Sequence, residues 1–416
     1  MFVFKKIFCR CYQQIFHIAI PFLPYRKPKI LSGVTELPDL FGKKKISSVL
    51  LVTDKSIRSL GLTKTLEDVL KDAGIKCAVY DNTVANPTTV NVEEARQQYI
   101  DNQCEALIGF GGGSSIDCAK AVGARIVRPG KELADMEGIL KVRRRLPLII
   151  AVPTTAGTGS ETTLAAVITD ADTRHKYPVN DFPLIPHYAV LDPQVTRSLP
   201  PSLTATTGMD ALTHAVEAYI GRSTTAGTRK DAVKAVKLIF KYIRNAYNNG
   251  NDMKARKNML YAAYLAGSAF TKSYVGYVHA VAHSLGGKYN TPHGLANAVL
   301  LPHVLEAYGS SAEHKLNKLA KAAGLASDTT EDAAGAAAFI EAIKQMKNDL
   351  NIPDVLPEIR EEDIPELAGY ADKEANPLYP VPKLMNAKEL EQFYYCVMSP
   401  SPENPLPDDS EQTQAL

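Results

Sequence analysis

The chain has 416 residues, which is too long for one ordinary hydrophobic core, so we expect two domains. Its net charge is only +2, and it contains no basic run with interleaved aromatic residues, which argues against nucleic-acid binding. Six cysteines are scattered without a CxxC pair, too few for a disulfide framework of this length. This usage predicts a reducing, cytoplasmic environment.

The N-terminal segment is apolar with early positive charge, so it resembles a signal sequence or a membrane anchor. Its apolar part, from Ile15 to Leu23, is too short to span a bilayer, and His17 and Pro21 interrupt it. No small-residue cleavage site follows. We therefore predict no membrane span, and we interpret residues 1–30 as an N-terminal arm: an edge strand or a segment packed on the domain or on a partner subunit.

Short apolar runs alternate with segments of helical spacing through the first half of the chain. We expect strands at residues 49–53, 77–80, 106–110 and 148–152, and helices at residues 63–73 and 92–103 and from residue 116. Strands that alternate with helices predict a parallel sheet with helices on both faces.

The pattern changes in the second half. From about residue 203 the chain consists of long helical segments rich in Ala, Leu and Lys, and the segment 192–201, with three prolines, is the expected hinge. Residues 399–416 are acidic, polar and rich in proline, which predicts a disordered tail.

Four histidines and one aspartate lie in a few motifs of this helical half. Asp210 and His214 are four residues apart in GMDALTHAVEAY, His279 and His283 are four apart in VHAVAHSLGG, and His293 follows in NTPHG. Residues at i and i+4 share a helix face, so two short helices can direct several ligands to one point. Three histidines with a carboxylate suit a divalent first-row metal such as Fe(II) or Zn(II). The alternative is a set of hydrogen-bonded core histidines, and spacing alone does not separate His279 from His283.

A glycine loop, GGGSS at residues 111–115, connects a predicted strand to a predicted helix. Glycines allow the backbone to approach a pyrophosphate, and a helix N-terminus offers free N–H groups and a positive dipole. The loop is not GxGxxG, so it is not the ordinary Rossmann fingerprint. Ser114 followed by Asp117 also resembles a helix-capping box, which leaves Asp117 with either a capping or a ligand-binding role.

Two further loops follow predicted strands. Asp54, in VTDK, can accept hydrogen bonds from ribose hydroxyls and would repel a 2′-phosphate, which favours NAD over NADP; the alternative is a surface turn residue. The segment PTTAGTGSE at 153–161 suits a second loop facing phosphate or nicotinamide, or a tight turn.

Together these motifs resemble the iron-containing (group III) alcohol dehydrogenase family. The matching stretches are VTDK, NPT at 86–88, GFGGGSSID, PTTAGTGSE, VITD with Lys176, GMDALTHAVEAY, HAVAHSLGGKYNTPHGLANAVLLP and, near 380–395, PVPKLM with its following helix. The resemblance implies an α/β N-terminal dinucleotide-binding domain with a parallel sheet over residues 1–200. An all-α C-terminal metal-binding domain would cover residues 201–398, with the site in the cleft.

The resemblance also implies roles for individual residues. Asp210, His214, His279 and His293 match the metal ligands, and His283 matches a histidine near the substrate that can relay protons. The residues that match the cofactor cleft are Asp54, Asn86, Gly112, Gly113, Ser114, Asp117, Thr154, Thr155, Thr163 and Lys176. One stretch departs from a common pattern: SYVGYVHA carries Tyr274 and Tyr277 where smaller or amide residues often precede the first ligating histidine, which leaves the substrate open.

We therefore predict a metal-dependent alcohol dehydrogenase or aldehyde reductase that transfers a hydride between NAD(P)(H) and a small alcohol or aldehyde. Fe²⁺ is the expected metal, with Zn²⁺ as an alternative, NAD(H) is favoured over NADP(H), and a homodimer or higher homo-oligomer is expected. A metallohydrolase, using the same ligands to activate water, would need neither the glycine loop nor Asp54. A non-catalytic metal- or nucleotide-binding protein would turn over no alcohol. Alternatives within the fold are a glycerol dehydrogenase, a lactaldehyde reductase and a hydroxyacid–oxoacid transhydrogenase.

Overall fold

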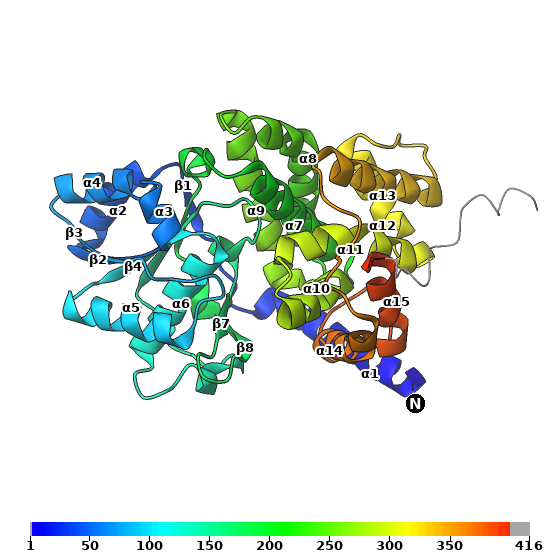
Figure 1. The fold of residues 1–416 in the computed structure, drawn as a ribbon, viewed down its shortest axis with the longest axis horizontal. Helices are drawn as coiled ribbons and strands as arrows, with labels where there is room; N and C mark the ends of the chain where they lie inside the picture. Colours follow the sequence, from blue (N-terminus) through cyan, green and yellow to red (C-terminus); the bar gives the residue numbers. More distant parts are fainter. Residues whose placement is uncertain (1, 400–416) are drawn as a thin grey trace, which may run out of the picture.

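The structure, a computed structural model, describes residues 2–399 and has a sheet-containing N-terminal half followed by a helical half (Figure 1). The main sheet has six strands in the order β1-β9-β6-β4-β2-β3, and every neighbouring pair is parallel. The strands are β1 (Lys29–Leu31), β2 (Ser48–Val52), β3 (Lys76–Tyr80), β4 (Ala106–Gly111), β6 (Leu148–Pro153) and β9 (Tyr188–Val190). The predicted fold class is confirmed.

Helices cover both faces of this sheet because its central strands are apolar on both sides. Leu50 and Val52 face one core, shared with α5 (Thr89–Asp101) and α6 (Gly113–Val127). The alternate residues Val49 and Leu51 face the other core, shared with α2 (Leu37–Lys44) and α4 (Lys64–Asp72). A run of consecutive apolar residues is the expected sequence of a strand buried on both faces.

The expected elements are present with small shifts of their ends. The helix expected from residue 116 begins earlier, at Gly113, because it starts directly in the glycine loop. This half also contains a short helix, α3 (Lys55–Ser59). A second, three-stranded sheet has the order β5-β8-β7 and consists of β5 (Gly138–Ile139), β7 (Ala165–Thr169) and β8 (Lys176–Asn180).

The second half is helical and has one continuous apolar core. Its helices are α7 (Pro201–Ile220), α8 (Ala226–Asn248), α9 (Met253–Ser273), α10 (Tyr277–Tyr289), α11 (His293–Tyr308), α12 (Glu313–Ala323), α13 (Asp332–Asp349), α14 (Ile364–Ala375) and α15 (Ala387–Val397). The proline-rich segment 192–201 connects β9 to α7 through a 3-10 turn. The domain boundary at residue 200 stays a prediction, and the expected disordered tail falls, from residue 400 onward, outside the described residues.

Most of the N-terminal arm is a helix rather than a strand, and only its end, at β1, forms an edge strand of the main sheet. Helix α1 (Phe2–Ala19) lies along the helical half beside α14 (Figure 1). The Lys5 ammonium is 2.7 Å from the Asp372 carboxylate, and the Gln13 amide donates to the backbone oxygen of Tyr379 at 2.7 Å. The arm therefore packs on this chain's own C-terminal half. No helix among residues 2–399 is long and apolar enough to cross a membrane.

Candidate metal centre and cofactor cleft

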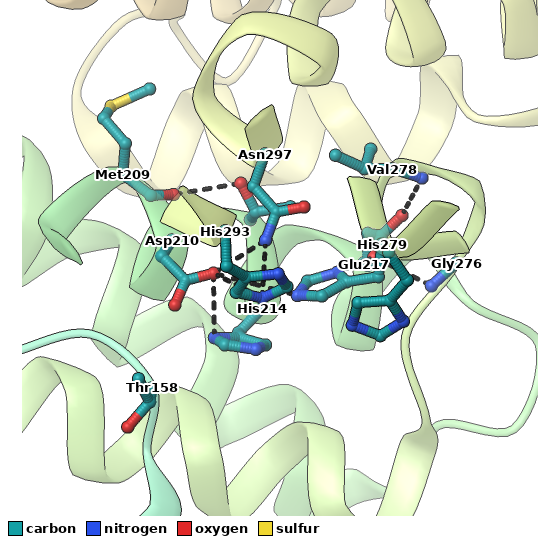
Figure 2. Close-up of polar contacts among 12 residues, drawn as sticks. Thr158, Met209, Asp210, His214, Glu217, Gly276, Val278, His279, His293 and Asn297 are labelled. Atoms are coloured by element: carbon teal, nitrogen blue, oxygen red, sulfur yellow. Dashed lines mark hydrogen bonds and ion pairs between the residues drawn. The ribbon is translucent and has the colours of Figure 1, made fainter. Parts of the chain in front are cut away.

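Three helices of the C-terminal half bring four predicted ligands to one point. Asp210 and His214 lie one turn apart on α7, His279 is on α10, and His293 is the first residue of α11. One ligand atom from each lies within 4.8 Å of those of the other three. The Asp210 Oδ1 is 3.9 Å from His214 Nδ1, 3.8 Å from His279 Nε2 and 3.4 Å from His293 Nε2. Figure 2 draws these residues with dashed lines between them. His283, the fifth member of the sequence pattern, is not in this group.

The chemistry of these groups fits a divalent cation. Among the described residues, His214 Nδ1 and His279 Nε2 are buried nitrogens with no hydrogen-bond partner. Burial lowers the pKa of both imidazoles, and it lowers the pKa of His293 to about 4. Neutral imidazole with a free lone pair is the form that binds a metal. Unpaired buried nitrogens are costly in an apolar core, so the cluster is better explained by a cation than by core histidines.

Glu217 orients His279 by binding its Nδ1, the ring nitrogen that faces away from the cluster. Its carboxylate accepts hydrogen bonds from His279 Nδ1 at 2.6 Å and from the backbone N–H groups of Gly276 at 2.8 Å and Val278 at 2.9 Å (Figure 2). A proton on Nδ1 leaves Nε2 free toward the cluster. A Cβ on Gly276 would lie 2.6 Å from Glu217 Oε1, so only glycine permits this approach.

Asn297 supports the opposite side of the cluster. Its amide donates to Asp210 Oδ1 at 2.8 Å and lies 3.0 Å from His293 Nε2. Sequence analysis missed both supporting residues, although a signal existed. Asn297 follows His293 by one helical turn, and Glu217 follows Asp210 by two turns within the same motif, so both share a face with a ligand.

His283 lies beside the cluster with a different partner. Its Nδ1 is 2.6 Å from Glu374 Oε1, which also accepts a hydrogen bond from the Tyr379 hydroxyl at 2.6 Å. Its ring is stacked with that of His293, with 5.1 Å between centroids. Burial lowers the pKa of His283, but the charge and hydrogen bond of Glu374 outweigh that effect and raise it. Glu374 and Tyr379 come from a segment some ninety residues later, and no sequence pattern indicated them.

A pocket of about 540 Å³ opens at the carboxyl ends of β2 and β4. The chain passes from β2 to β3 on one side and then to β4 on the other, so these two strands flank a topological switch point, where open α/β sheets bind ligands. The predicted cofactor residues that line this pocket are Asp54, Gly112, Gly113 and Ser114.

The glycine loop is shaped by close packing of β4 against α6. Gly111 has a φ of +150°, and a Cβ there would lie 2.5 Å from Ser115 Oγ. A Cβ on Gly109 would lie 2.9 Å from the Cα of Ile116. The N-cap of α6 is Gly112, without a side-chain cap, so the capping-box alternative for Ser114 and Asp117 is wrong. The first N–H groups of α6 are therefore not occupied by a capping side chain.

Asp117 instead belongs to a buried polar network with Lys120, a residue that sequence analysis missed. The Asp117 carboxylate accepts from Ser160 Oγ at 2.6 Å and from the backbone N–H of Val167 at 3.0 Å. Lys120 Nζ donates to Ser160 Oγ and to Thr163 Oγ1, both at 2.9 Å. Burial lowers the pKa of Lys120, against the raising effect of Asp117. Asp117 and Thr163 are therefore part of a hydrogen-bonded network that connects α6, which follows the glycine loop, to the segment 160–167.

Three predicted residues form a bridge beside the pocket. Lys176 Nζ donates to Asn86 Oδ1 at 2.6 Å, and the Asn86 backbone N–H donates to Ser114 Oγ at 3.4 Å. These contacts join the first residue of β8 to the glycine loop. The positive charge of Lys176 also acts to lower the pKa of His283 and of His293.

The loop 153–161 connects the cofactor cleft to the metal cluster. Thr154 is buried, and its backbone N–H donates to the Gly111 oxygen at 2.9 Å. The Thr155 side chain lies 3.7 Å from the position of a Cβ on Gly112. Further along, Gly157 packs against α7, the helix that carries Asp210 and His214: a Cβ on Gly157 would lie 2.6 Å from the Cβ of Thr207. The two sites are therefore joined by one short loop.

Asp54 caps a helix as well as lining the pocket. It is the N-cap of α3, and its Oδ1 accepts from the backbone N–H of Ile57 at 2.9 Å. Tyr277, one of the two tyrosines that precede the first ligating histidine of α10, is buried, and its hydroxyl donates to the backbone oxygen of Met385 at 3.0 Å. Tyr274 packs between Phe16 and Tyr379, with ring centroids 5.0 and 6.3 Å away.

Known proteins match this chain over nearly all of its described length. The family model described as iron-containing alcohol dehydrogenase matches residues 28–193, and the model of the family's C-terminal part matches residues 204–398. A 1,3-propanediol dehydrogenase of Citrobacter freundii is 39% identical over 388 residues, which cover 92% of this chain and 98% of the relative.

Two further relatives agree. An NAD-dependent methanol dehydrogenase of Bacillus methanolicus is 37% identical over 339 residues, covering 81% of this chain and 88% of the relative. The crystal structure of a 1,3-propanediol oxidoreductase superimposes with a TM-score of 0.85 at 35% identity, covering 89% of this chain and 97% of that one. The chain therefore belongs to the iron-containing alcohol dehydrogenase family and is a metal-dependent alcohol or aldehyde oxidoreductase.

Proposed function

We propose that Asp210, His214, His279 and His293 hold one divalent ion, Fe(II) with Zn(II) as the alternative, for the interconversion of a small alcohol and its aldehyde. The observation that carries this proposal is the cluster of four ligand atoms within 4.8 Å, in which the buried His214 Nδ1 and His279 Nε2 have no hydrogen-bond partner among residues 2–399. A metallohydrolase is not favoured, because it has no use for a cleft at the switch point of the sheet.

When bound, such an ion supplies Lewis acidity toward an alcohol or carbonyl oxygen, and nicotinamide supplies or accepts the hydride. The protein's own residues position these groups. Glu217 keeps the His279 proton on Nδ1, and Asn297 orients the Asp210 carboxylate by its 2.8 Å hydrogen bond. His283, whose Nδ1 is bound to Glu374, has Nε2 left for transfer of the substrate proton.

The direct test of this function is NADH oxidation with a panel of short aldehydes, on enzyme reconstituted with Fe(II) or Zn(II). We expect metal-dependent turnover of at least one aldehyde, and the panel includes the aldehyde of 1,3-propanediol because two relatives are named for that diol. Turnover without added or retained metal would contradict the proposal. An ester hydrolysed in its place would favour the metallohydrolase.

His283→Ala should reduce turnover without releasing the metal. General acid–base catalysis typically contributes about 10²- to 10⁴-fold, so we expect a loss of kcat within that range. Metal content, measured by mass spectrometry, should stay at the wild-type value because His283 lies outside the group of four. A loss of metal as large as that of His279→Ala would mean that the two roles are exchanged.

Asp54→Gly should raise the relative use of NADP(H). We propose that NAD(H) binds with its adenosine ribose near Asp54, where a 2′-phosphate would meet a like charge costing on the order of 1–3 kcal/mol. Roughly 1.4 kcal/mol is tenfold in specificity, so the ratio of kcat/KM values should shift by about tenfold or more.

Asp54→Asn is the matched control for the capping role of this residue. Glycine at an N-cap costs only a few tenths of a kcal/mol and asparagine keeps the cap, so both variants should fold. Both should shift cofactor choice in the same direction, because both remove the charge. Wild-type preference for NADPH, or an unchanged ratio in both variants, would leave Asp54 as a helix cap only.

The oligomeric state and the compartment are also proposals. We propose a homodimer or higher homo-oligomer, which light scattering of the purified protein would test. All six cysteines are free thiols, four of them buried or half-buried, which supports a reducing, cytoplasmic location.

A further inference from the structure

The outward face of α1 is apolar along its whole length. Phe4 is 80% exposed, Ile15 is 70% exposed, and Phe22, in the 3-10 turn that follows the helix, is 84% exposed. Phe8 and Ile18 are also more than half exposed. We call these five residues the apolar stripe. They recur at spacings of three, four or seven residues, which places them on one side of the helix.

The opposite face of α1 is firmly attached to the body of the protein. Cys9 and Gln13 are buried, and the Gln13 amide donates to the backbone oxygens of Pro377 and Tyr379. Phe16 makes an edge-on contact with Tyr274. Because these contacts fix the rotation of the helix, the apolar stripe cannot turn inward without breaking them. Exposed apolar surface of this extent marks an interaction site.

Positive charge is concentrated in the same segment. The first 35 residues contain six Lys and Arg and no Asp or Glu, whereas the whole chain has a net charge of only +2, so the rest of the chain is net acidic. Arg10 donates to the backbone oxygens of Val381 and Pro382, and these neutral partners leave its charge uncompensated. Lys5 and Lys27 pair with Asp372 and Asp231, each at 2.7 Å, but both of these carboxylates lie outside the segment, which itself carries no acidic residue.

These charges distinguish between two kinds of occupant. A second copy of α1 would bring the same cations together, and the segment has no acidic residue to pair with them. The surface of a bilayer with anionic lipids would accept the apolar stripe and attract the cations at the same time. An 18-residue helix is about 27 Å long, so it can lie flat on such a surface.

We propose that α1 docks the enzyme on the surface of a bilayer that contains anionic phospholipid, with the apolar stripe inserted at the level of the headgroups. The helix lies in the plane of the interface and does not span the membrane. Because α1 packs on the C-terminal half, this half of the docked enzyme faces the lipid.

The experiment is flotation of the metal-loaded, full-length enzyme with phosphatidylcholine vesicles, with and without phosphatidylserine. The stripe variant is Phe8→Ser with Ile15→Ser, and the matched control is Val90→Ser with Ile100→Ser, two exposed apolar residues of α5. Wild type and control should float with the anionic vesicles, less so at high salt. The stripe variant should bind at least about tenfold more weakly, because burial of two apolar side chains is lost.

Turnover in solution should be unchanged in the stripe variant, because its two substituted residues lie outside both sites; this shows that the protein is folded. Equal flotation of the wild type and the stripe variant would overturn the proposal. Wild-type protein that does not float with the anionic vesicles would overturn it as well. Light scattering gives a further outcome. A loss of oligomers in the stripe variant alone, without lipid, would assign the face to a second copy and would also overturn the proposal.

Discussion

Replacing His279 with alanine should deprive the enzyme of both metal and activity. His279 Nε2 is a buried nitrogen 3.8 Å from Asp210 Oδ1, and it has no hydrogen-bond partner in the described part of the chain. Loss of a direct ligand should weaken metal binding by more than the 10- to 100-fold typical of an outer-shell partner. Loss of several kcal/mol of Lewis-acid stabilisation should reduce kcat/KM by about 1000-fold or more.

The measurement is metal content by mass spectrometry, beside aldehyde reduction at saturating NADH. Glu217→Ala is the graded control: it removes the acceptor of the His279 Nδ1 proton but no ligand, so its metal affinity should fall by about 10- to 100-fold and excess metal should restore part of the activity. If purified His279→Ala retained the metal content of the wild type, the assignment of His279 as a metal ligand would be wrong.

Replacing Lys120 with alanine should destabilise the N-terminal half strongly. The ammonium is fully buried and donates to Ser160, Thr163 and the backbone oxygen of Ala165, and it lies 3.5 Å from Asp117 Oδ1. Removal of one partner of a buried ion pair typically costs about 3–5 kcal/mol, because the other charge is left uncompensated. We expect a fall in Tm on the order of 5–10 °C, measured by calorimetry.

Two variants separate this effect from a general loss of charge. Lys64→Ala removes an ammonium from an exposed pair with Asp68 and should leave the Tm unchanged. Adding Asp117→Asn to Lys120→Ala removes the uncompensated carboxylate and should recover part of the lost stability. A Tm of Lys120→Ala close to that of the wild type would show that the buried network contributes little to stability.

Local periodicity was enough to predict the fold class. The consecutive apolar residues of β2 predicted burial on both faces, and the structure places Leu50 and Val49 in separate cores on opposite sides of the sheet. N-terminal α1 is the exception. The short apolar part of this segment, interrupted by His17 and Pro21, left its secondary structure open between an edge strand and an arm packed on the domain or on a partner subunit.

The ligands of the candidate metal centre could be predicted from the sequence where two of them lie in one short motif. Asp210 and His214 lie one turn apart, so the spacing alone places them on one face of α7. Family resemblance was needed to choose His279 over His283 as the metal ligand. Both lie on the same face of α10, four residues apart, so their spacing does not tell them apart. The structure supports the choice by their partners, since Glu217 binds His279 and Glu374 binds His283.

The sequence by itself therefore determined the alternation of strands and helices, the glycine loop between β4 and α6, and the motifs that carry Asp210, His214 and His293. Only the tertiary structure decided the partners of the other polar side chains. His283 is bound by Glu374, and Asp117 is paired with Lys120 instead of capping a helix. The physical reason is the range of the interactions. Helix faces and strand faces follow from the repeat of the backbone, whereas the partners of buried polar groups come from distant segments that only packing brings together.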